Sequence, residues 1–260
     1  MRLNVIERDP DHDSRATPVV FIHGLFGRAR NLSFLQRQAA KTRRTLALDL
    51  RSHGASPHGK LDYMAMVGDV METLGAYDAL PAILVGHSMG GKVAMALALQ
   101  HPERVAGLLV GDIAPARTGH GQSTLGEAML RLNFPPHLDR KEALVLLGSV
   151  VPREDMRNLM LQNLRLDDPP GWEIGLQEIV DSMPNIENWP YVPEGHVYNG
   201  PTLFIRGERS PYIRPEHYPV MARLFPHYRL ETIPGVGHWL HAENPQRFSE
   251  LMLAFLKDIP

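Results

Sequence analysis

The sequence predicts an α/β fold in which helices flank a mostly parallel central sheet and a helical segment interrupts the core. In the first part of the chain, short apolar runs alternate with longer helix-forming stretches. From about Pro115 to Asn199, strand-like runs are scarce and prolines are frequent, and from Pro201 the alternation resumes. Strands separated by helices form βαβ units, so most strands of the sheet should be parallel.

The composition describes a globular chain without strong electrostatic character. Of its 260 residues 43% are hydrophobic and 22% are charged, and the net charge of −2 favours neither nucleic acid nor an anionic membrane. The absence of cysteine excludes disulfides, thiolate metal sites and a cysteine nucleophile. Because we find no signal peptide and no apolar stretch long enough to span a membrane, we expect a cytoplasmic protein. The sequence leaves the oligomeric state open.

In the first half of the chain, runs of apolar and often β-branched residues predict buried strands. These strands are expected at Pro18–Ile22, Arg44–Leu50, Pro81–Gly86 and Val105–Val110. The stretches between them have helical composition, at Asn31–Lys41, Met64–Leu80 and Met89–Gln100. Gly68 and Gly75 weaken the second of these helices, and Pro102 ends the third.

The interrupting segment, residues 116–199, is expected to form a helical cap or lid, with short helices such as Thr124–Leu132 and Arg153–Leu164. Residues 1–115 and 200–260 would then form the core. The later core elements are expected as a strand, a helix, a strand and a closing helix, at Pro201–Arg206, Pro215–Phe225, Tyr228–Ile233 and Pro245–Lys257. Segments inserted at the carboxyl ends of strands often cover a site there.

A nucleophile is indicated by Gly86-His87-Ser88-Met89-Gly90-Gly91, which matches the pattern G-x-S-x-G. An apolar strand ends at this motif and a helix-forming stretch follows it, which is the context of a nucleophile elbow with serine at its apex. The turn is so tight that a side chain at Gly86 or Gly90 would clash with neighbouring backbone. The helix that begins at Met89 favours negative charge developing near Ser88.

Serine needs a base to remove its proton, and the sequence offers 13 histidines. His238 lies between the last strand and the last helix, in a glycine-containing loop that opens at the same sheet edge as the elbow. His87 adjoins Ser88, but adjacent side chains at a sharp turn diverge. His23 and His53 follow strand ends and are expected to order their loops. We therefore predict His238 as the base.

The third group must be a carboxylate that fixes the imidazole tautomer and stabilises its cation. Asp112 and Glu208 each follow a predicted strand, and either gives the chain order serine, acid, histidine. Asp112 ends a buried strand, whereas Glu208 precedes Arg209, with which it can form a solvated pair. We favour Asp112 and keep Glu208 as the alternative.

Acyl transfer also requires hydrogen-bond donors for the oxyanion. We predict the backbone N–H groups of Met89 and Leu25, with the Phe26 N–H as second choice for the latter. The side chains of Leu25 and Met89 are then free to line an apolar pocket. Aromatic and apolar residues near the site loops or in the cap are further candidates for this pocket: Phe26, Met183, Trp189, Tyr212 and Trp239.

Several motifs together resemble the bacterial YbfF-type esterases of the α/β-hydrolase superfamily. They are His23–Gly27, Asp49–Pro57, Gly86–Lys92, Asp112–Pro115, Ser210–Tyr212 and Gly237–Trp239. In most of the superfamily an acid stands where this chain has Ser210, so the resemblance implies that the acid has moved to the preceding strand, at Asp112. The resemblance also implies an α/β-hydrolase fold and activity on short acyl esters and thioesters without a cofactor.

The expected function is therefore that of a serine hydrolase that cleaves carboxylic esters of short to medium acyl chains, or acyl thioesters, through an acyl-enzyme. Carbon–carbon hydrolases and cofactor-free perhydrolases keep the same triad and stay open. A non-catalytic ligand-binding member is less favoured, because such proteins usually lack a triad residue. The sequence has no P-loop, which argues against a kinase or nucleotide enzyme, and no His-Glu-x-x-His, so we expect no metal. The charge balance predicts no nucleic-acid partner, and the resemblance implies no cofactor. We interpret Lys92 as a helix-surface lysine.

Overall fold

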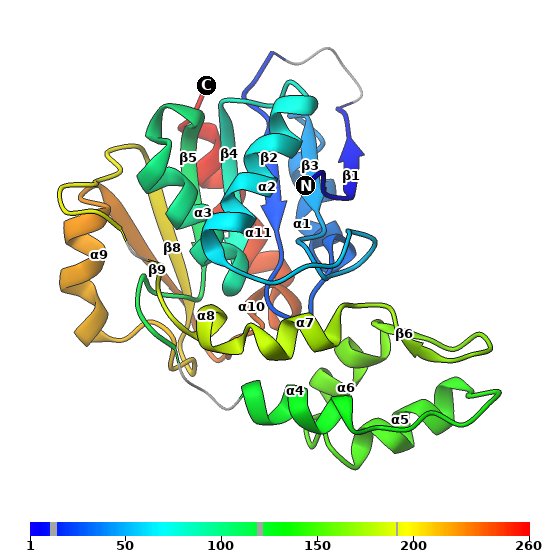
Figure 1. Cartoon of the computed structure of the whole chain (residues 1–260). Helices are drawn as coiled ribbons and strands as arrows, with labels where there is room; N and C mark the ends of the chain where they lie inside the picture. The colour runs from blue at the N-terminus through cyan, green and yellow to red at the C-terminus, as the bar shows by residue number, and fades with distance from the viewer. Residues whose placement is uncertain (11–14, 119–121, 191) are drawn as a thin grey trace.

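A computed structural model describes residues 1–10, 15–118, 122–190 and 192–260, and its centre is a seven-stranded sheet (Figure 1). The strands in sheet order are β1 (Val5–Arg8), β3 (Thr45–Leu48), β2 (Val19–Ile22), β4 (Ala82–His87), β5 (Val105–Gly111), β8 (Thr202–Gly207) and β9 (Tyr228–Ile233). β1 pairs antiparallel with β3, and the other neighbouring strands pair in parallel. The predicted α/β class and mostly parallel sheet are confirmed.

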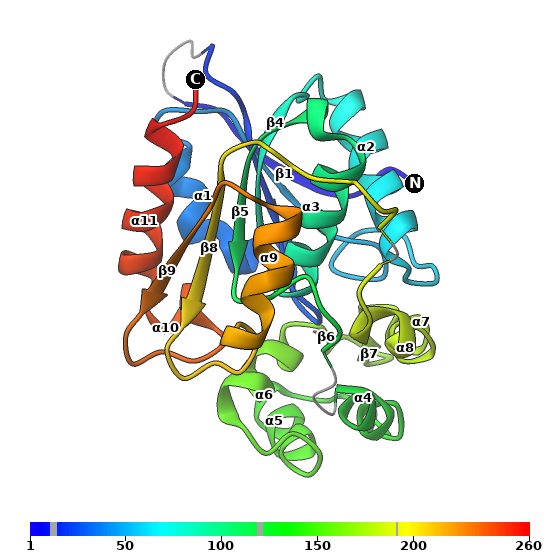
Figure 2. The ribbon, with the colours of Figure 1, turned by 90° about the vertical axis from the view of Figure 1, so that its left-hand side faces the viewer.

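Helices cover both faces of the sheet (Figure 2). The 3-10 helix η1 (Ala29–Leu32), α1 (Ser33–Ala39) and α11 (Pro245–Lys257) lie on one face. The other face carries α2 (Tyr63–Ala76), α3 (Met89–Gln100) and α9 (Tyr218–Leu224). The short elements η2 (Pro102–Arg104), η3 (Pro215–His217) and α10 (Leu240–Glu243) connect these parts.

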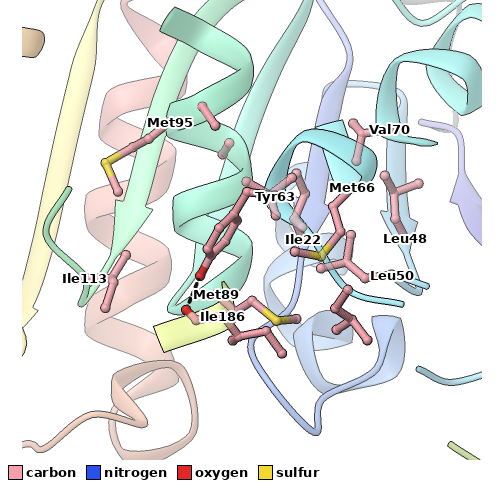
Figure 3. Close-up of a cluster of buried hydrophobic side chains, with 14 of the residues drawn as sticks. Ile22, Leu48, Leu50, Tyr63, Met66, Val70, Met89, Met95, Ile113 and Ile186 are labelled. Carbon is pink, nitrogen blue, oxygen red and sulfur yellow. Dashed lines mark hydrogen bonds between the residues drawn. The ribbon is translucent and has the colours of Figure 1, made fainter. Parts of the chain in front are cut away.

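The inner strands β3, β2, β4, β5 and β8 are buried on both faces, which explains why they appear in the sequence as continuous apolar runs. Along β2, Val19 and Phe21 belong to the core on the α1 and α11 side, whereas Val20 and Ile22 belong to the core on the α2 and α3 side. Figure 3 shows part of the second core, in which Ile22 and Leu48 of the sheet lie near Met66 and Val70 of α2. Each fully buried side chain of this size contributes roughly 1.5–3 kcal/mol to stability.

The chain between β5 and β8 places its helices and hairpin beyond the carboxyl ends of the parallel strands (Figures 1 and 2). It contains α4 (Gln122–Leu130), α5 (Arg140–Gly148), α6 (Glu154–Leu161), α7 (Leu176–Asp181) and α8 (Met183–Glu187), with a small hairpin of β6 (Leu164–Arg165) and β7 (Gly171–Trp172). These elements therefore stand over the sheet edge at which the sequence places the site residues.

Some predicted boundaries shift for local reasons. The helix predicted to end at Leu80 ends at Ala76, because Asp78 adopts a positive φ of 47° that a helix cannot continue through. β1 and the hairpin were not predicted, since their strands of four and two residues are too short to show an apolar pattern. Within the described ranges, no helix combines the length and apolar character needed to cross a membrane.

Candidate active site

Ser88 lies at a sharp turn between β4 and α3, with φ 53° and ψ −120°. Such a conformation is rare for a residue with a side chain and is typical of functional sites. A Cβ atom added to Gly86 would lie 2.4 Å from the Gly90 carbonyl oxygen, and one added to Gly90 would lie 2.3 Å from the Ile22 carbonyl oxygen. The expectation that neither glycine tolerates a side chain is confirmed.

His238 lies between Ser88 and Asp112, although both are more than a hundred positions away in sequence. Its Nε2 is 3.0 Å from Ser88 Oγ, and its Nδ1 is 2.7 Å from Asp112 Oδ2. Asp112 follows β5 and is fully buried. Because a carboxylate only accepts, this contact places a proton on Nδ1 and leaves Nε2 to accept the serine proton.

The Asp112 carboxylate is also held by two further groups. The Gly207 N–H donates to Oδ1 at 3.0 Å, and the Ser210 hydroxyl donates to Oδ2. Ser210 follows β8 and has no ionisable group of its own. Sequence reasoning noted its position but gave it no role, and here it orients the carboxylate that faces the imidazole.

Glu208, the alternative acid, points elsewhere. Its Oε2 accepts the Gly235 N–H at 2.8 Å, which ties the end of β8 to the loop that precedes His238. The carboxylate that the structure brings to the imidazole is therefore that of Asp112, while Glu208 braces the loop behind it.

The ring of His87 supports the loop of His238 instead of facing Ser88. His87 Nε2 donates to the His238 carbonyl oxygen at 2.9 Å, and the ring packs against His241 with centroids 4.4 Å apart. Burial lowers the pKa of His87 well below its ordinary value and that of His241 to about 4, so both rings are neutral at pH 7. On the other side, the Tyr212 ring stacks on His238 at 4.1 Å.

The loop after β2 contributes backbone groups near Ser88. The Phe26 N–H donates to His53 Nε2 at 3.1 Å, and the Gly27 N–H donates to the Gly24 carbonyl oxygen at 2.9 Å. Among the described residues, the N–H groups of Leu25 and Met89 have no protein acceptor. The second choice, Phe26, therefore has its N–H engaged, whereas the N–H groups of Leu25 and Met89 remain available to a ligand.

A cavity of about 990 Å³ opens at Ser88 and His238, between the core and the segment that follows β5. Predicted pocket residues that line it are Leu25, Phe26, Met89, Met183, Tyr212 and Trp239. Trp189 was predicted to line it as well, and this prediction is wrong. Trp189 follows α8, where the chain turns toward α2, and it lines a second cavity of about 510 Å³ together with Asp62 and Met64.

Lys92 was expected on a helix surface, but the structure buries it with 1% of its surface exposed. Its Nζ donates to Thr118 Oγ1 at 3.0 Å and to the carbonyl oxygens of Glu187 and Asn188 at 3.3 and 2.8 Å. It also lies 5.7 Å from the centroid of the Tyr63 ring. Burial lowers the pKa of Lys92 to about 7. The expectation is wrong because residues distant in sequence, Thr118, Glu187 and Asn188, cover the face of α3 that carries the lysine.

In the described part of the chain, no three His, Asp or Glu side chains are grouped so that they could hold a metal ion. The arrangement at Ser88 offers instead a nucleophile, a base with its carboxylate, and two free N–H groups beside an apolar cavity. These are the components of acyl transfer through a covalent serine intermediate.

Comparisons with known proteins agree with this chemistry. A family model described as alpha/beta hydrolase fold matches residues 17–245. The sn-1-specific diacylglycerol lipase ABHD11 of Mus musculus is 39% identical over 95% of this chain and 83% of that protein. Esterase YbfF of Escherichia coli (strain K12) is 30% identical over 99% of this chain and 100% of that protein. A solved structure titled marine microorganism esterase superposes with a TM-score of 0.90, at 28% identity, and covers 98% of this chain and 99% of that chain.

Proposed function

The chain belongs to the α/β-hydrolase family, and from this premise we propose that it is a serine hydrolase that cleaves carboxylic esters with Ser88, His238 and Asp112 as its triad. The observation that carries the proposal is the position of His238, with Nε2 3.0 Å from Ser88 Oγ and Nδ1 2.7 Å from Asp112 Oδ2. Relatives named esterase and lipase favour ester hydrolysis over carbon–carbon cleavage or perhydrolysis.

In the first half of the reaction, His238 Nε2 takes the proton of Ser88 as Oγ attacks the carbonyl carbon of the substrate. The negative charge that forms on the carbonyl oxygen is stabilised by the Leu25 and Met89 N–H groups. As the tetrahedral intermediate collapses, His238 gives the proton to the leaving alcohol or thiol. The acyl group then remains as an ester of Ser88.

In the second half, water replaces the alcohol. His238 takes a proton from the water as its oxygen attacks the acyl-enzyme, and the same two N–H groups stabilise the second oxyanion. Collapse returns the proton to Ser88 and releases a carboxylic acid. Asp112 holds the imidazole in the required tautomer throughout and stabilises its cation.

The substrates that we propose are esters of short to medium acyl chains, and acyl thioesters of similar length. The cavity of about 990 Å³ supports this class, because its walls include Phe26, Met183 and Trp239, which suit an acyl chain. We also propose that residues 116–199 act as a cap that closes this cavity over the sheet edge, while residues 1–115 and 200–260 form the core.

The proposal is tested with a series of p-nitrophenyl esters from acetate to decanoate and their thioester counterparts. Wild-type protein should hydrolyse the shorter members, and Ser88→Ala should lower kcat by about 10⁴–10⁶-fold. A fluorophosphonate probe should modify Ser88, as located by mass spectrometry of the labelled peptide. Hydrolysis that survives in Ser88→Ala, or labelling at another residue, would contradict the proposal.

A further inference from the structure

The turn that presents Leu25 contains a residue in a disfavoured conformation. Phe26 has a φ of 60° and is the third residue of a four-residue turn closed by the bond from the Gly27 N–H to the Gly24 carbonyl oxygen. A positive φ at this position is usually reserved for glycine. Phe26 is nevertheless buried and lines the large cavity, so the surrounding structure has to hold its backbone in place.

Buried side chains from opposite sides bond to both polar groups of the Phe26 backbone. From the core, His53 Nε2 accepts the Phe26 N–H at 3.1 Å, while His53 Nδ1 donates to the Arg51 carbonyl oxygen at 2.9 Å. Burial lowers the pKa of His53 to about 3, so the ring stays neutral and Nε2 remains an acceptor. From the cap, Asn163 Nδ2 donates to the Phe26 carbonyl oxygen at 2.7 Å.

Asn163 is itself held in one orientation. It lies between α6 and β6 and is fully buried. Its backbone N–H donates to the Met160 carbonyl oxygen at 2.9 Å, and its own carbonyl accepts the Glu173 N–H at 2.8 Å. Its Oδ1 accepts from Arg28 Nη2 at 3.5 Å, which leaves Nδ2 directed at Phe26.

The direction of the Leu25 N–H follows from the geometry of this turn. In a planar trans peptide the carbonyl oxygen and the N–H point in opposite directions. The Gly24 carbonyl oxygen is fixed by the Gly27 N–H at 2.9 Å and by His23 Nδ1 at 2.8 Å, so the Leu25 N–H of the same peptide must point away from them. A change of the Phe26 backbone would turn this peptide and move the donor.

We propose that Asn163 is a positioning residue for the oxyanion hole, so that the Leu25 N–H is aligned only while the cap is seated on the core. The inference rests on the proposed function, in which that N–H stabilises the tetrahedral intermediate. Asn163 touches neither the triad nor the acyl group, and its effect passes through the Phe26 carbonyl. Seating of the cap thereby assembles the catalytic site as well as covering it.

The adjacent residue provides a matched control. Gln162 Oε1 accepts a hydrogen bond from Asn31 Nδ2 at 2.8 Å, across the same boundary between cap and core. This bond is exposed and does not involve the turn from Gly24 to Gly27. Gln162→Ala therefore removes one exposed contact between cap and core and leaves the bond from Asn163 to the Phe26 carbonyl oxygen in place.

The experiment compares wild type with Asn163→Ala, Asn163→Asp and Gln162→Ala, each as the full chain. For a short p-nitrophenyl ester, Asn163→Ala should lower kcat by about 10–100-fold while KM changes less than about 3-fold. The inhibition constant of an alkyl boronic acid, whose adduct with Ser88 is tetrahedral, should rise by a factor similar to the loss in kcat. Gln162→Ala should stay within about 2-fold of wild type in all three quantities.

Asn163→Asp keeps the size of the side chain and serves as the second variant if Asn163→Ala does not fold. Its carboxylate faces the Phe26 carbonyl oxygen, so its losses should be at least as large. Unchanged boronic acid affinity in a folded Asn163 variant, or equal losses in Gln162→Ala, would overturn the inference while the proposed function stands. If wild type hydrolyses no ester, the proposed function fails, and the labelling rate of Ser88 by a fluorophosphonate then tests Asn163. If wild type shows neither hydrolysis nor labelling, the proposed function and the role of Asn163 are both overturned.

Discussion

The hydroxyl of Ser210 donates to the same oxygen of Asp112 that faces His238, which makes this oxygen a shared acceptor for a hydroxyl and an imidazole. The two donors come from different strand ends, since Ser210 follows β8 and His238 follows β9. Hydrogen bonds to a charged acceptor are stronger than those between neutral groups, so Ser210 helps to fix the carboxylate in the plane that the imidazole requires.

Ser210→Ala should therefore reduce kcat without unfolding the protein. The loss of one hydrogen bond to a carboxylate, worth about 1.5–3 kcal/mol, predicts a decrease of roughly 10-fold or more if the bond strengthens as His238 becomes charged. Ser210→Thr keeps the hydroxyl and should retain most of the activity. Steady-state kinetics on a p-nitrophenyl ester checks both variants, and equal losses in the two would argue against a role for the hydroxyl.

The choice of acid is tested by exchanging each carboxylate for its amide. Asp112→Asn should lower kcat by about 10³–10⁴-fold, because an amide can donate to Nδ1 and so favours the wrong imidazole tautomer. Glu208→Gln should cost less than about 3-fold, since its amide oxygen can still accept the Gly235 N–H. Single-turnover acylation rates measure the effect directly. A larger loss in Glu208→Gln would show that the acid is misassigned.

Replacing glycine by alanine should have opposite effects on stability at Gly90, in the tight turn at the nucleophile, and at Gly68, in α2. Gly90→Ala should destabilise the protein by about 1–3 kcal/mol or more, because its Cβ would lie 2.3 Å from backbone oxygen that cannot easily move. Gly68→Ala in α2 meets nothing within 4 Å and should stabilise by about 0.5–1 kcal/mol. Urea unfolding of both variants provides the comparison, and a neutral Gly90→Ala would mean that the turn is looser than the structure indicates.

Burial of Lys92 should make the free energy of unfolding depend on pH. In the folded protein burial lowers its pKa to about 7, whereas the ordinary value is 10.5. Between these values the unfolded chain binds more protons than the folded protein, so the free energy of unfolding should rise with pH across this window. From pH 7 to pH 9 the gain attributable to Lys92 should be roughly 2 kcal/mol.

Lys92→Met is the control, because it removes the titrating group and keeps an unbranched apolar stem. The difference in unfolding free energy between wild type and this variant, measured in urea at both pH values, should grow in favour of wild type as pH rises. A difference that is constant with pH would show that the lysine keeps the same proton affinity in both states.

Local sequence patterns predict much of this fold, including the bounds of β9 and α11, where apolar periodicity and Pro245 mark the elements. The expected membership of the α/β-hydrolase superfamily is confirmed. β1 escaped prediction because only Val5 and Ile6 among its four residues are apolar, and pairing with β3 decides its conformation. Edge strands of this kind depend on a partner that local sequence does not reveal.

The candidate site likewise has a part that the sequence predicts and a part that it does not. Ser88 and Asp112 directly follow strands, and His238 lies in a loop that opens at the same edge, where the carboxyl ends of parallel strands meet, so topology alone brings them near one another. The surroundings of Lys92 and Asn163 come from residues as much as 96 and 137 positions away, which no local pattern reveals. Their hydrogen bonds become visible only when the contacts of the segment between β5 and β8 are known.

The segment proposed as a cap leaves the sheet after β5 and returns to it before β8, and these two strands are neighbours. A segment connected in this manner can be exchanged for a foreign one without rethreading the sheet, which opens a route to altered substrate range by grafting. Such a graft has to preserve two sets of contacts with the core, those of the Phe26 carbonyl and those of Lys92. A donor segment has to carry an amide for the Phe26 carbonyl, which the proposed oxyanion hole requires, and acceptors for the Lys92 ammonium, which stability requires.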